Sequence, residues 1–188
     1  MKKAFPIALM LFGLVFIGAG LYTANRGFDA KDQVRDELIA QNITTTEDAS
    51  IPNTRVDSPS TARAMADIID VHAREATGDL TYSELGRFAA KNGDATGTND
   101  EQAALTGADG KPVPNPLRNT AFQASSLRTS LYASIMAFNV ADLVVGLGAM
   151  LVGLGIAVGG IGIALAGLAI PAFGRRLHVD PVAAHPAA

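Results

Sequence analysis

One histidine of this sequence stands among carboxylates and could do acid–base or metal chemistry. His72 is preceded by Asp70 and followed at i+3 by Glu75, so the imidazole and one carboxylate could share a helix face. Catalytic zinc and iron sites use several protein ligands, usually with more than one His. His178 and His185 belong to a Pro/Ala-rich tail that we place on the other side of a membrane. We therefore expect His72 to be a structural or solvent-exposed helix residue, with no metal and no catalytic role.

A second stretch, NGDATGTNDE, resembles a calcium-binding loop. Oxygen-bearing side chains occupy alternating positions, at Asn92, Asp94, Thr96, Thr98 and Asp100. Calcium loops use such oxygens and close the site with a bidentate Glu at the twelfth position. Ala103 stands where the closing Glu belongs. The sequence favours an acidic turn over a calcium site.

Asn139 and Asp142 interrupt a long apolar block near the C-terminus. A carboxylate inside a membrane would indicate a path for protons or ions. Counting about 20 residues back from Ala172 places the outer edge of a bilayer core near Val152, which leaves Asp142 in the headgroup zone or above it. We favour the interfacial position.

The segment GLGIAVGG lacks the preceding strand of a dinucleotide loop, and we predict no cofactor.

Two apolar blocks indicate where the chain resides. The first runs from Ala4 to Tyr22 after two lysines, and the second runs from Ala133 to Phe173 without any Lys or Arg. A hydrocarbon core needs roughly 20 apolar helical residues, so each block is long enough to span it. The first block could also be a signal peptide cleaved near Gly18-Ala19-Gly20. Its length favours an uncleaved anchor.

The cations beside the apolar blocks predict the orientation. Lys2 and Lys3 precede the first block, and Arg175 and Arg176 follow the second. Cations next to spans stay in the cytoplasm, so both termini should be cytoplasmic in a plasma-membrane protein. The predicted parts are a transmembrane helix (1–24), an extracytoplasmic helical domain (25–132), an extended helix that includes the second span (133–173), and a cytoplasmic tail (174–188).

Charge and cysteine content exclude several classes of function. The chain has 188 residues and a net charge of −3, and its outer segment carries 11 Lys and Arg against 16 Asp and Glu. This balance gives no reason to expect a nucleic-acid partner. The absence of Cys excludes disulfides, thiolate metal sites and cysteine nucleophiles.

The outer segment contains several helix signals and no alternating strand pattern. The first helix should continue through FDAKDQVRDELIAQN, because this stretch after Gly27 contains no Gly or Pro. Ser58-Pro59 is typical of an N-cap followed by Pro at N1, with Gly78 as the stop. Capping-box patterns predict short helices at 81–92 and 98–107. Asn115-Pro116 should begin a helix that continues into the second span. The predicted fold is all-α, with two transmembrane helices flanking a small, mostly helical extracytoplasmic domain.

The second span carries eight glycines between Gly146 and Gly167 in a regular spacing. A 4-3-4-3 spacing follows one face of a helix, and small residues allow membrane helices to approach closely. One such face contains Gly153, Ala157, Gly160, Ala164 and Gly167. The other contains Gly155, Gly159, Gly162, Ala166 and Ala169. Two faces predict two neighbours: the first helix, through Gly13, Gly20 and Ala24, and another membrane protein or a second copy of this chain.

Several segments resemble an actinobacterial family of small two-span membrane proteins of unknown function. They include AQNITTTEDASIPNTRVDSPSTARAMADII, TYSELGRF, KPVPNPLRNTAFQASSLRTSLY and AFNVADLVVGLG, and the most specific is NPLRNTAFQ. The resemblance covers about residues 41–148. Some members carry an automatic label as aromatic-ring-opening dioxygenases, which implies an iron site built from several His and carboxylates. His72 is the single histidine of the outer segment, which is too few for such an iron site, and the resemblance transfers no catalytic residue.

The leading hypothesis is a non-enzymatic integral membrane protein that acts as an accessory or scaffolding subunit in the cell envelope. Its partners would be the lipid bilayer and another membrane protein or a second copy. One alternative is a protein that handles ions or small molecules, with Asp142 and the glycine faces lining a path. Another is an enzyme acting at the outer surface.

The predicted orientation can be tested with single cysteines, because the native chain has none. In intact cells, an impermeant thiol reagent should label Thr96→Cys and leave Ala184→Cys unlabelled until the cells are lysed. Labelling of the Ala184 variant alone would reverse the topology.

Overall fold

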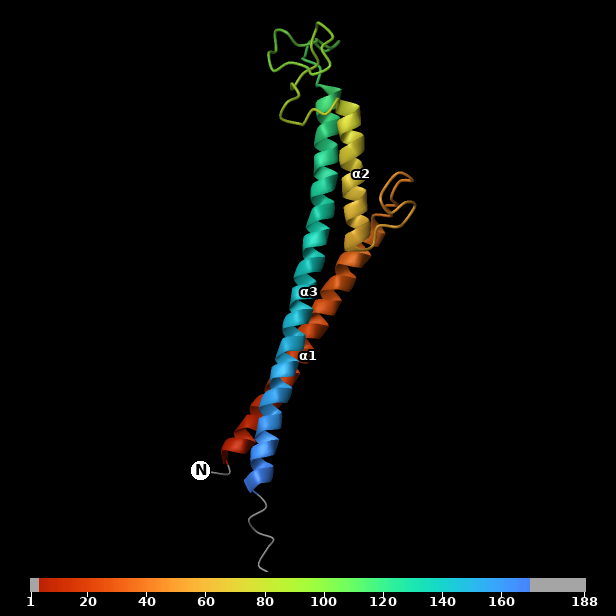
Figure 1. Ribbon diagram of the computed structural model, residues 1–188. Helices are drawn as coiled ribbons and strands as arrows, with labels where there is room; N and C mark the ends of the chain where they lie inside the picture. Colours follow the sequence, from red (N-terminus) through yellow and green to blue (C-terminus); the bar gives the residue numbers. More distant parts are fainter. Residues whose placement is uncertain (1–3, 170–188) are drawn as a thin grey trace, which may run out of the picture. The chain divides into compact units, whose positions relative to one another are not determined.

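The computed structural model describes residues 4–169, which form three α-helices and no β-strand (Figure 1). Helix α1 spans Ala4–Ala40, α2 spans Pro59–Thr77, and α3 spans Pro116–Ala169. The all-α class is thereby confirmed for this part of the chain. The proposed cytoplasmic tail and the flanking cations lie outside the described residues.

Helices α1 and α3 are long enough and apolar enough to cross a membrane. They have 37 and 54 residues, and α3 runs without interruption through all its glycines. The expected continuation of the first helix to about residue 40 and the helix start at Asn115-Pro116 are both confirmed. Asn115 caps α3, because its Oδ1 accepts a hydrogen bond from the Leu117 N–H at 3.0 Å.

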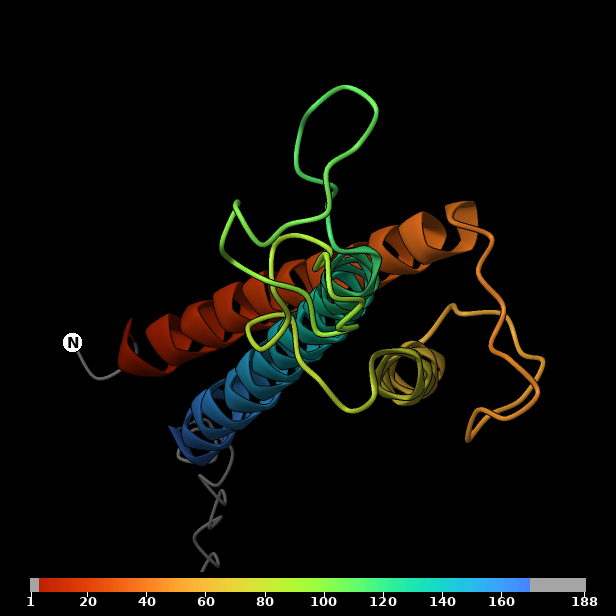
Figure 2. The same ribbon diagram turned by 90° about the horizontal axis from the view of Figure 1, so that it is seen from above.

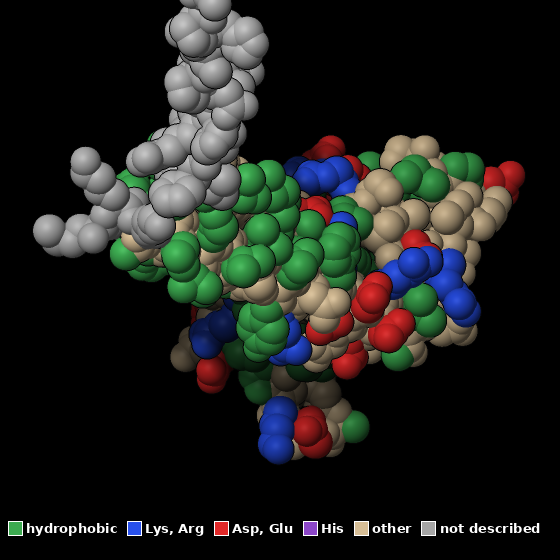
Figure 3. Space-filling view, turned by 90° about the horizontal axis from the view of Figure 1, so that it is seen from below, with side chains coloured by type: hydrophobic (Ala, Val, Ile, Leu, Met, Phe, Trp, Pro, Cys, Tyr) green, Lys and Arg blue, Asp and Glu red, His purple; other side chains and the backbone are tan. Residues whose placement is uncertain are grey.

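The chain folds as two compact units. The first contains the described part of α1 up to Arg26 and the part of α3 from Val144 onward, and the second contains Gly27–Leu143. In the first unit the two helices lie against each other, and apolar side chains gather on the surface seen from below (Figure 3). Among the described residues of this unit Arg26 is the only charged one, and the exposed large apolar side chains suit a lipid environment.

The second unit has a small core between the end of α1, helix α2 and the beginning of α3. Its buried residues are Leu38, Val56, Ala62, Ala66, Leu131, Ile135 and Phe138. The two alanines bring the α2 backbone close to its neighbours, and the larger side chains come from α1, α3 and the α1–α2 loop. The two connecting segments, between α1 and α2 and between α2 and α3, lie apart from one another (Figure 2).

The ends of α2 follow the sequence signals. The Ser58 hydroxyl accepts a hydrogen bond from the Thr61 N–H, and the Thr61 hydroxyl accepts one from the Ser58 N–H, which completes a capping box. Pro59 occupies N1, where a missing N–H costs nothing. Gly78 ends the helix with φ at +64°, a left-handed conformation that glycine adopts without a steric penalty.

The prediction of two short helices at 81–92 and 98–107 is wrong. This region consists of turns joined by isolated antiparallel bridges, including Phe88 with Thr98 and Ala90 with Ala104. The Thr81 N–H does donate to the Glu84 carboxylate at 2.8 Å, as a capping box requires, but only one turn forms. After Leu85 the chain extends, because Gly86 packs directly on the Thr98 backbone and Phe88 exchanges two backbone hydrogen bonds with Thr98.

The second false helix signal has a local cause. The Thr98 hydroxyl accepts a hydrogen bond from the Asp100 N–H at 3.1 Å, and the Asp100 carboxylate accepts one from the Gln102 N–H at 2.9 Å. Such bonds between residues i and i+2 form turns and compete with helix formation. The same residue types therefore support a turn here as readily as a helix N-terminus.

The small core should depend strongly on Phe138, whose side chain is almost wholly buried. Phe138→Ala should lower the free energy of unfolding by about 3–5 kcal/mol, the usual range for Phe-to-Ala changes in a core. Phe122→Ala is the matched control on the same helix, because Phe122 is 55% exposed and its main ring contact is with Tyr82. It should cost about 1 kcal/mol. Denaturation of the purified protein, followed by circular dichroism, measures both, and equal losses would contradict this description of the core.

Candidate functional site

One row of glycines on α3 packs against α1 in the first unit. The row consists of Gly148, Gly155 and Gly162, each seven residues from the next. A Cβ added to Gly155 would lie 2.6 Å from the Gly13 carbonyl oxygen, and one added to Gly162 would lie 2.9 Å from the Pro6 carbonyl oxygen. Real Cβ atoms do not approach backbone atoms so closely. Only glycine therefore fits in this row without a shift of the helices.

Helix α1 presents matching glycines to the same contact. A Cβ on Gly13 would lie 2.7 Å from the Gly159 Cα, and one on Gly20 would lie 2.6 Å from the Gly148 carbonyl oxygen. Both glycines are buried. Close approach of two backbones through small residues is the usual way in which membrane helices associate. Of the packing residues proposed from the sequence, Gly155, Gly159 and Gly162 lie at this contact.

The other proposed residues form a second row that meets nothing in the described part of the chain. A Cβ added to Gly153, Gly160 or Gly167 would have no neighbouring heavy atom within 4 Å. The row, which we name the open row, is Gly153, Ala157, Gly160, Ala164 and Gly167, all exposed. The structure thus separates the two small faces: one is occupied by α1, and one is free of contacts within 4–169.

The carboxylate of Asp142 is paired in the second unit. Lys31 Nζ lies 2.7 Å from Asp142 Oδ1, and the Asp142 side chain is 57% exposed. The pair joins α1 to α3 across 111 positions of sequence. Sequence reasoning singled out Asp142 but could not assign its partner, because the register between the two helices is a tertiary property.

His72 has a partner that its own helix does not supply. Its Nε2 lies 2.7 Å from Asp48 Oδ2, in the loop between α1 and α2, whereas the sequence pointed to Glu75. The contact holds the loop against α2 on an exposed surface. Within residues 4–169, no group of three or more His, Asp or Glu side chains is placed to hold a metal ion.

The oxygens of the Asn92–Asp100 stretch bind the backbone of their own loop. Asn92 Oδ1 accepts from the Asp94 N–H, and Asp94 Oδ1 accepts from both the N–H and the hydroxyl of Thr96. A donor two residues downstream is the signature of an Asx turn. The alternation that resembled a calcium loop is thus the spacing of consecutive turns.

A polar cluster joins α2 to α3, and sequence reasoning missed it. The Asp70 carboxylate accepts from Arg74 at 3.1 Å and from Arg128 of α3 at 2.6 Å, and Asp67 accepts from the Tyr132 hydroxyl at 3.1 Å. The Arg74 bond lies within α2, whereas the Arg128 and Tyr132 bonds join α3 to α2. Their signal in the sequence was weak, because Arg128 is 58 positions from Asp70.

The segment that begins at Asn115 ties α3 to the irregular region. The Asn115 Nδ2 donates to the Thr96 carbonyl at 3.0 Å. The Arg118 guanidinium lies 3.9 Å from the centre of the Tyr82 ring and donates to the Leu85 carbonyl.

Comparisons with protein families, with curated proteins and with solved structures find no match for this chain. The function must therefore be inferred from the geometry.

The turn at Thr81 gives a prediction for pH dependence. Hydrogen bonds from the Thr81 hydroxyl, at 2.6 Å, and from its N–H lower the pKa of Glu84 below its ordinary value of 4.5. The turn therefore gains stability from the ionised carboxylate above about pH 4.5 and loses it as the pH falls through the lowered pKa. Thr81→Val should raise the Glu84 pKa toward 4.5 in a carboxyl NMR titration. Thr98→Val should leave it unchanged, and an unmoved pKa in the Thr81 variant would contradict the assignment.

Proposed function

We propose that this chain is a non-enzymatic integral protein of the plasma membrane that serves as an accessory or scaffolding subunit. Helices α1 and α3 cross the bilayer, and the second unit lies outside. The open row of α3 binds a helix of another membrane protein or of a second copy. The proposal includes membership of the actinobacterial two-span family that the sequence resembles.

The observation that carries this proposal is the difference between the two small rows of α3. Both rows have glycine at intervals of seven, and one row is filled by α1 to the point of backbone contact. Lipid chains provide no hydrophobic force between helices, so packing and close approach determine which helix faces associate. A face with the same small residues and no partner within residues 4–169 is suited to a helix from outside.

The pairing of α1 with α3 supports a membrane position for both. Pro6 packs at Gly162 and Ala24 packs at Gly148, so the apolar block of α1 lies beside this part of α3. This pairing favours an outer edge of the bilayer core near Gly148 of α3. That is about one helical turn before Val152, the position obtained by counting back from Ala172. Asp142 then lies beyond the apolar core, in the headgroup zone.

The ion pair of Asp142 favours this arrangement over an ion path. An intramembrane carboxylate that conducts ions faces a cavity or a partner inside the bundle. Asp142 instead is exposed and bound to Lys31. The two cytoplasmic termini follow from Lys2, Lys3, Arg175 and Arg176, as the flanking charges require.

The two rows can be distinguished by substitution. Gly153→Leu and Gly160→Leu add bulk where the chain has open space, so the monomer should keep its stability and lose its partner. Gly155→Leu and Gly162→Leu add bulk against the α1 backbone and should destabilise the monomer itself by about 1–3 kcal/mol. If bulk on the open row costs a similar free energy in partner binding, association with the partner helix would weaken by roughly tenfold or more.

Association is measured by cross-linking in native membranes and by the mass of the complex after mild extraction, and stability is measured by thermal unfolding. Ile161→Leu is the control, because it lies beside the open row and hardly changes volume. The proposal is wrong if open-row leucines leave the complex unchanged while Gly162→Leu destabilises the chain.

A further inference from the structure

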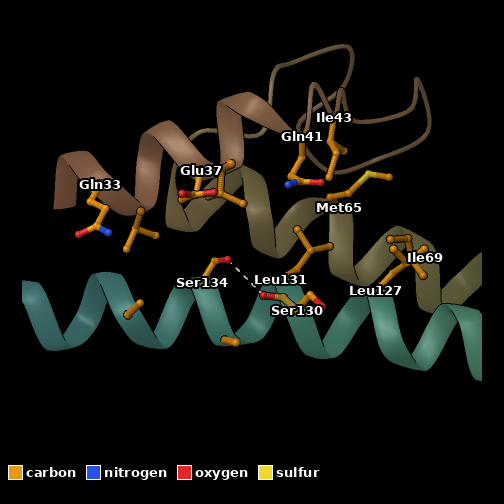
Figure 4. A pocket seen from close by; sticks show the side chains of 14 residues that line it. Gln33, Glu37, Gln41, Ile43, Met65, Ile69, Leu127, Ser130, Leu131 and Ser134 are labelled. Atoms are coloured by element: carbon orange, nitrogen blue, oxygen red, sulfur yellow. Dashed lines mark hydrogen bonds between the residues drawn. The ribbon is translucent and has the colours of Figure 1, made fainter. Parts of the chain in front are cut away.

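A cavity of about 720 Å³ opens between the end of α1, helix α2 and the beginning of α3 (Figure 4). Its walls include Val34 and Leu38 of α1, Met65 and Ile69 of α2, and Leu131 of α3. All its lining residues belong to the second unit. A volume of this size is within the usual range for small-molecule sites, which are mostly apolar with a few polar groups.

The lining has a definite chemical character. Among the described residues that line it, the apolar members are aliphatic or Met, none is aromatic or cationic, and Glu37 alone is charged. The amides of Gln33 and Gln41 and the hydroxyls of Ser130 and Ser134 supply its other polar groups. Flexible alkyl chains match such walls, whereas planar aromatic ligands usually meet aromatic partners.

The cavity is a gap in the core of the second unit. Leu38 and Leu131 are buried in the core cluster and also line the cavity, while Val34, Met65 and Ile69 pack against that cluster and are only partly buried. Leu127, at one wall, is 54% exposed. Apolar area left open to water lowers stability by about 25 cal/mol per Å² relative to burial, so an apolar occupant would stabilise the unit.

An acidic depression adjoins the cavity on α1. Its lining includes Asp32, Asp36 and Glu37, and both Gln33 and Glu37 line the cavity as well. The neighbouring cations of α1 are engaged with other groups: Lys31 binds Asp142 and Arg35 binds Asp57 at 3.1 Å. The negative charge at the cavity mouth is therefore not neutralised by these two residues, and it favours a positive group on any occupant.

The length of the walls fits a single alkyl chain. They extend from residue 33 of α1 to residue 41, just after the end of that helix, and from 127 to 137 on α3, or about 12–15 Å. That length corresponds to an extended chain of about ten carbons.

We propose that this cavity binds a single-chain amphiphile whose alkyl chain lies between α1, α2 and α3 and whose cationic amine head rests on Asp32, Asp36 and Glu37. This role is additional to the assembly role and rests on different residues. It does not depend on the open row.

The test uses the full chain in nanodiscs of zwitterionic lipid. The probe is a dodecylamine with a photoreactive diazirine in its alkyl chain, and the matched probe has the same chain ending in a carboxylate. Cross-linked peptides are located by mass spectrometry, so binding in the cavity is distinguished from dissolution in the bilayer. Adducts of the amine should map to Met65, Ile69 and Leu131, with a preference over the carboxylate of roughly fivefold or more.

Two pairs of variants separate chain recognition from head recognition. Ala137→Phe fills the cavity and should abolish the adducts, whereas Ala76→Phe adds the same bulk to an exposed part of α2 and should not. Glu37→Gln should reduce the preference for the amine, whereas Glu75→Gln, outside the cavity, should not.

Three results would overturn the proposal. The first is that adducts of the unmodified protein are confined to 4–24 and 144–169. The second is equal labelling by the two probes. The third is adducts in the cavity peptides that persist in Ala137→Phe while thermal unfolding shows that variant to be folded.

Discussion

The backbones of α1 and α3 approach so closely in the first unit that no side chain fits between them at Gly13, Gly20, Gly148 and Gly155. In water, a helix with so many glycines would be unstable, because each costs about 1 kcal/mol relative to alanine. In lipid, unpaired backbone groups are far more costly, so the helix persists and glycine provides contact area. The constraint also sets the register between the two helices, since each glycine must meet backbone rather than a side chain.

The features that the sequence predicts well depend on residues close together in the chain. The cap at Ser58, the stop at Gly78, the start at Asn115 and the glycine spacing all arise within a few positions. The signals at Thr81 and Thr98 were equally local but were overridden. The Gly86 N–H donates to the Thr96 carbonyl and Phe88 pairs with Thr98, while the side chains of Thr98 and Asp100 form competing turns. Local propensity specifies a helix only where no longer-range contact competes for the backbone.

The candidate sites show the same limit. Glycine periodicity identified both small rows of α3, but only the contacts with α1 show which one is free. The Asp48 partner of His72 and the Arg128 partner of Asp70 come from other elements, so spacing could not identify them. The cavity needs three helices at once, and its lining residues have no shared motif in the sequence.

The second unit is held by a mixture of weak and strong contacts because its core is small. Alanines at 62 and 66 bring α2 close but bury little area, so the larger side chains of Leu38, Val56, Leu131, Ile135 and Phe138 supply most of the apolar contact. Asp70 then fixes α2 on α3 through its charge-assisted bond with Arg128.

The two surfaces of this chain have different chemistry and therefore suit different occupants. The open row exposes backbone between small residues over several turns, and only another regular backbone can use that shape, as α1 does on the opposite row. The cavity instead has walls of flexible side chains and a carboxylate-rich mouth, which suit an occupant that is thin, apolar and positively charged at one end. An alkyl chain leaves the exposed backbone of the open row without a matching surface. The two proposed occupants would therefore use different surfaces and would not compete.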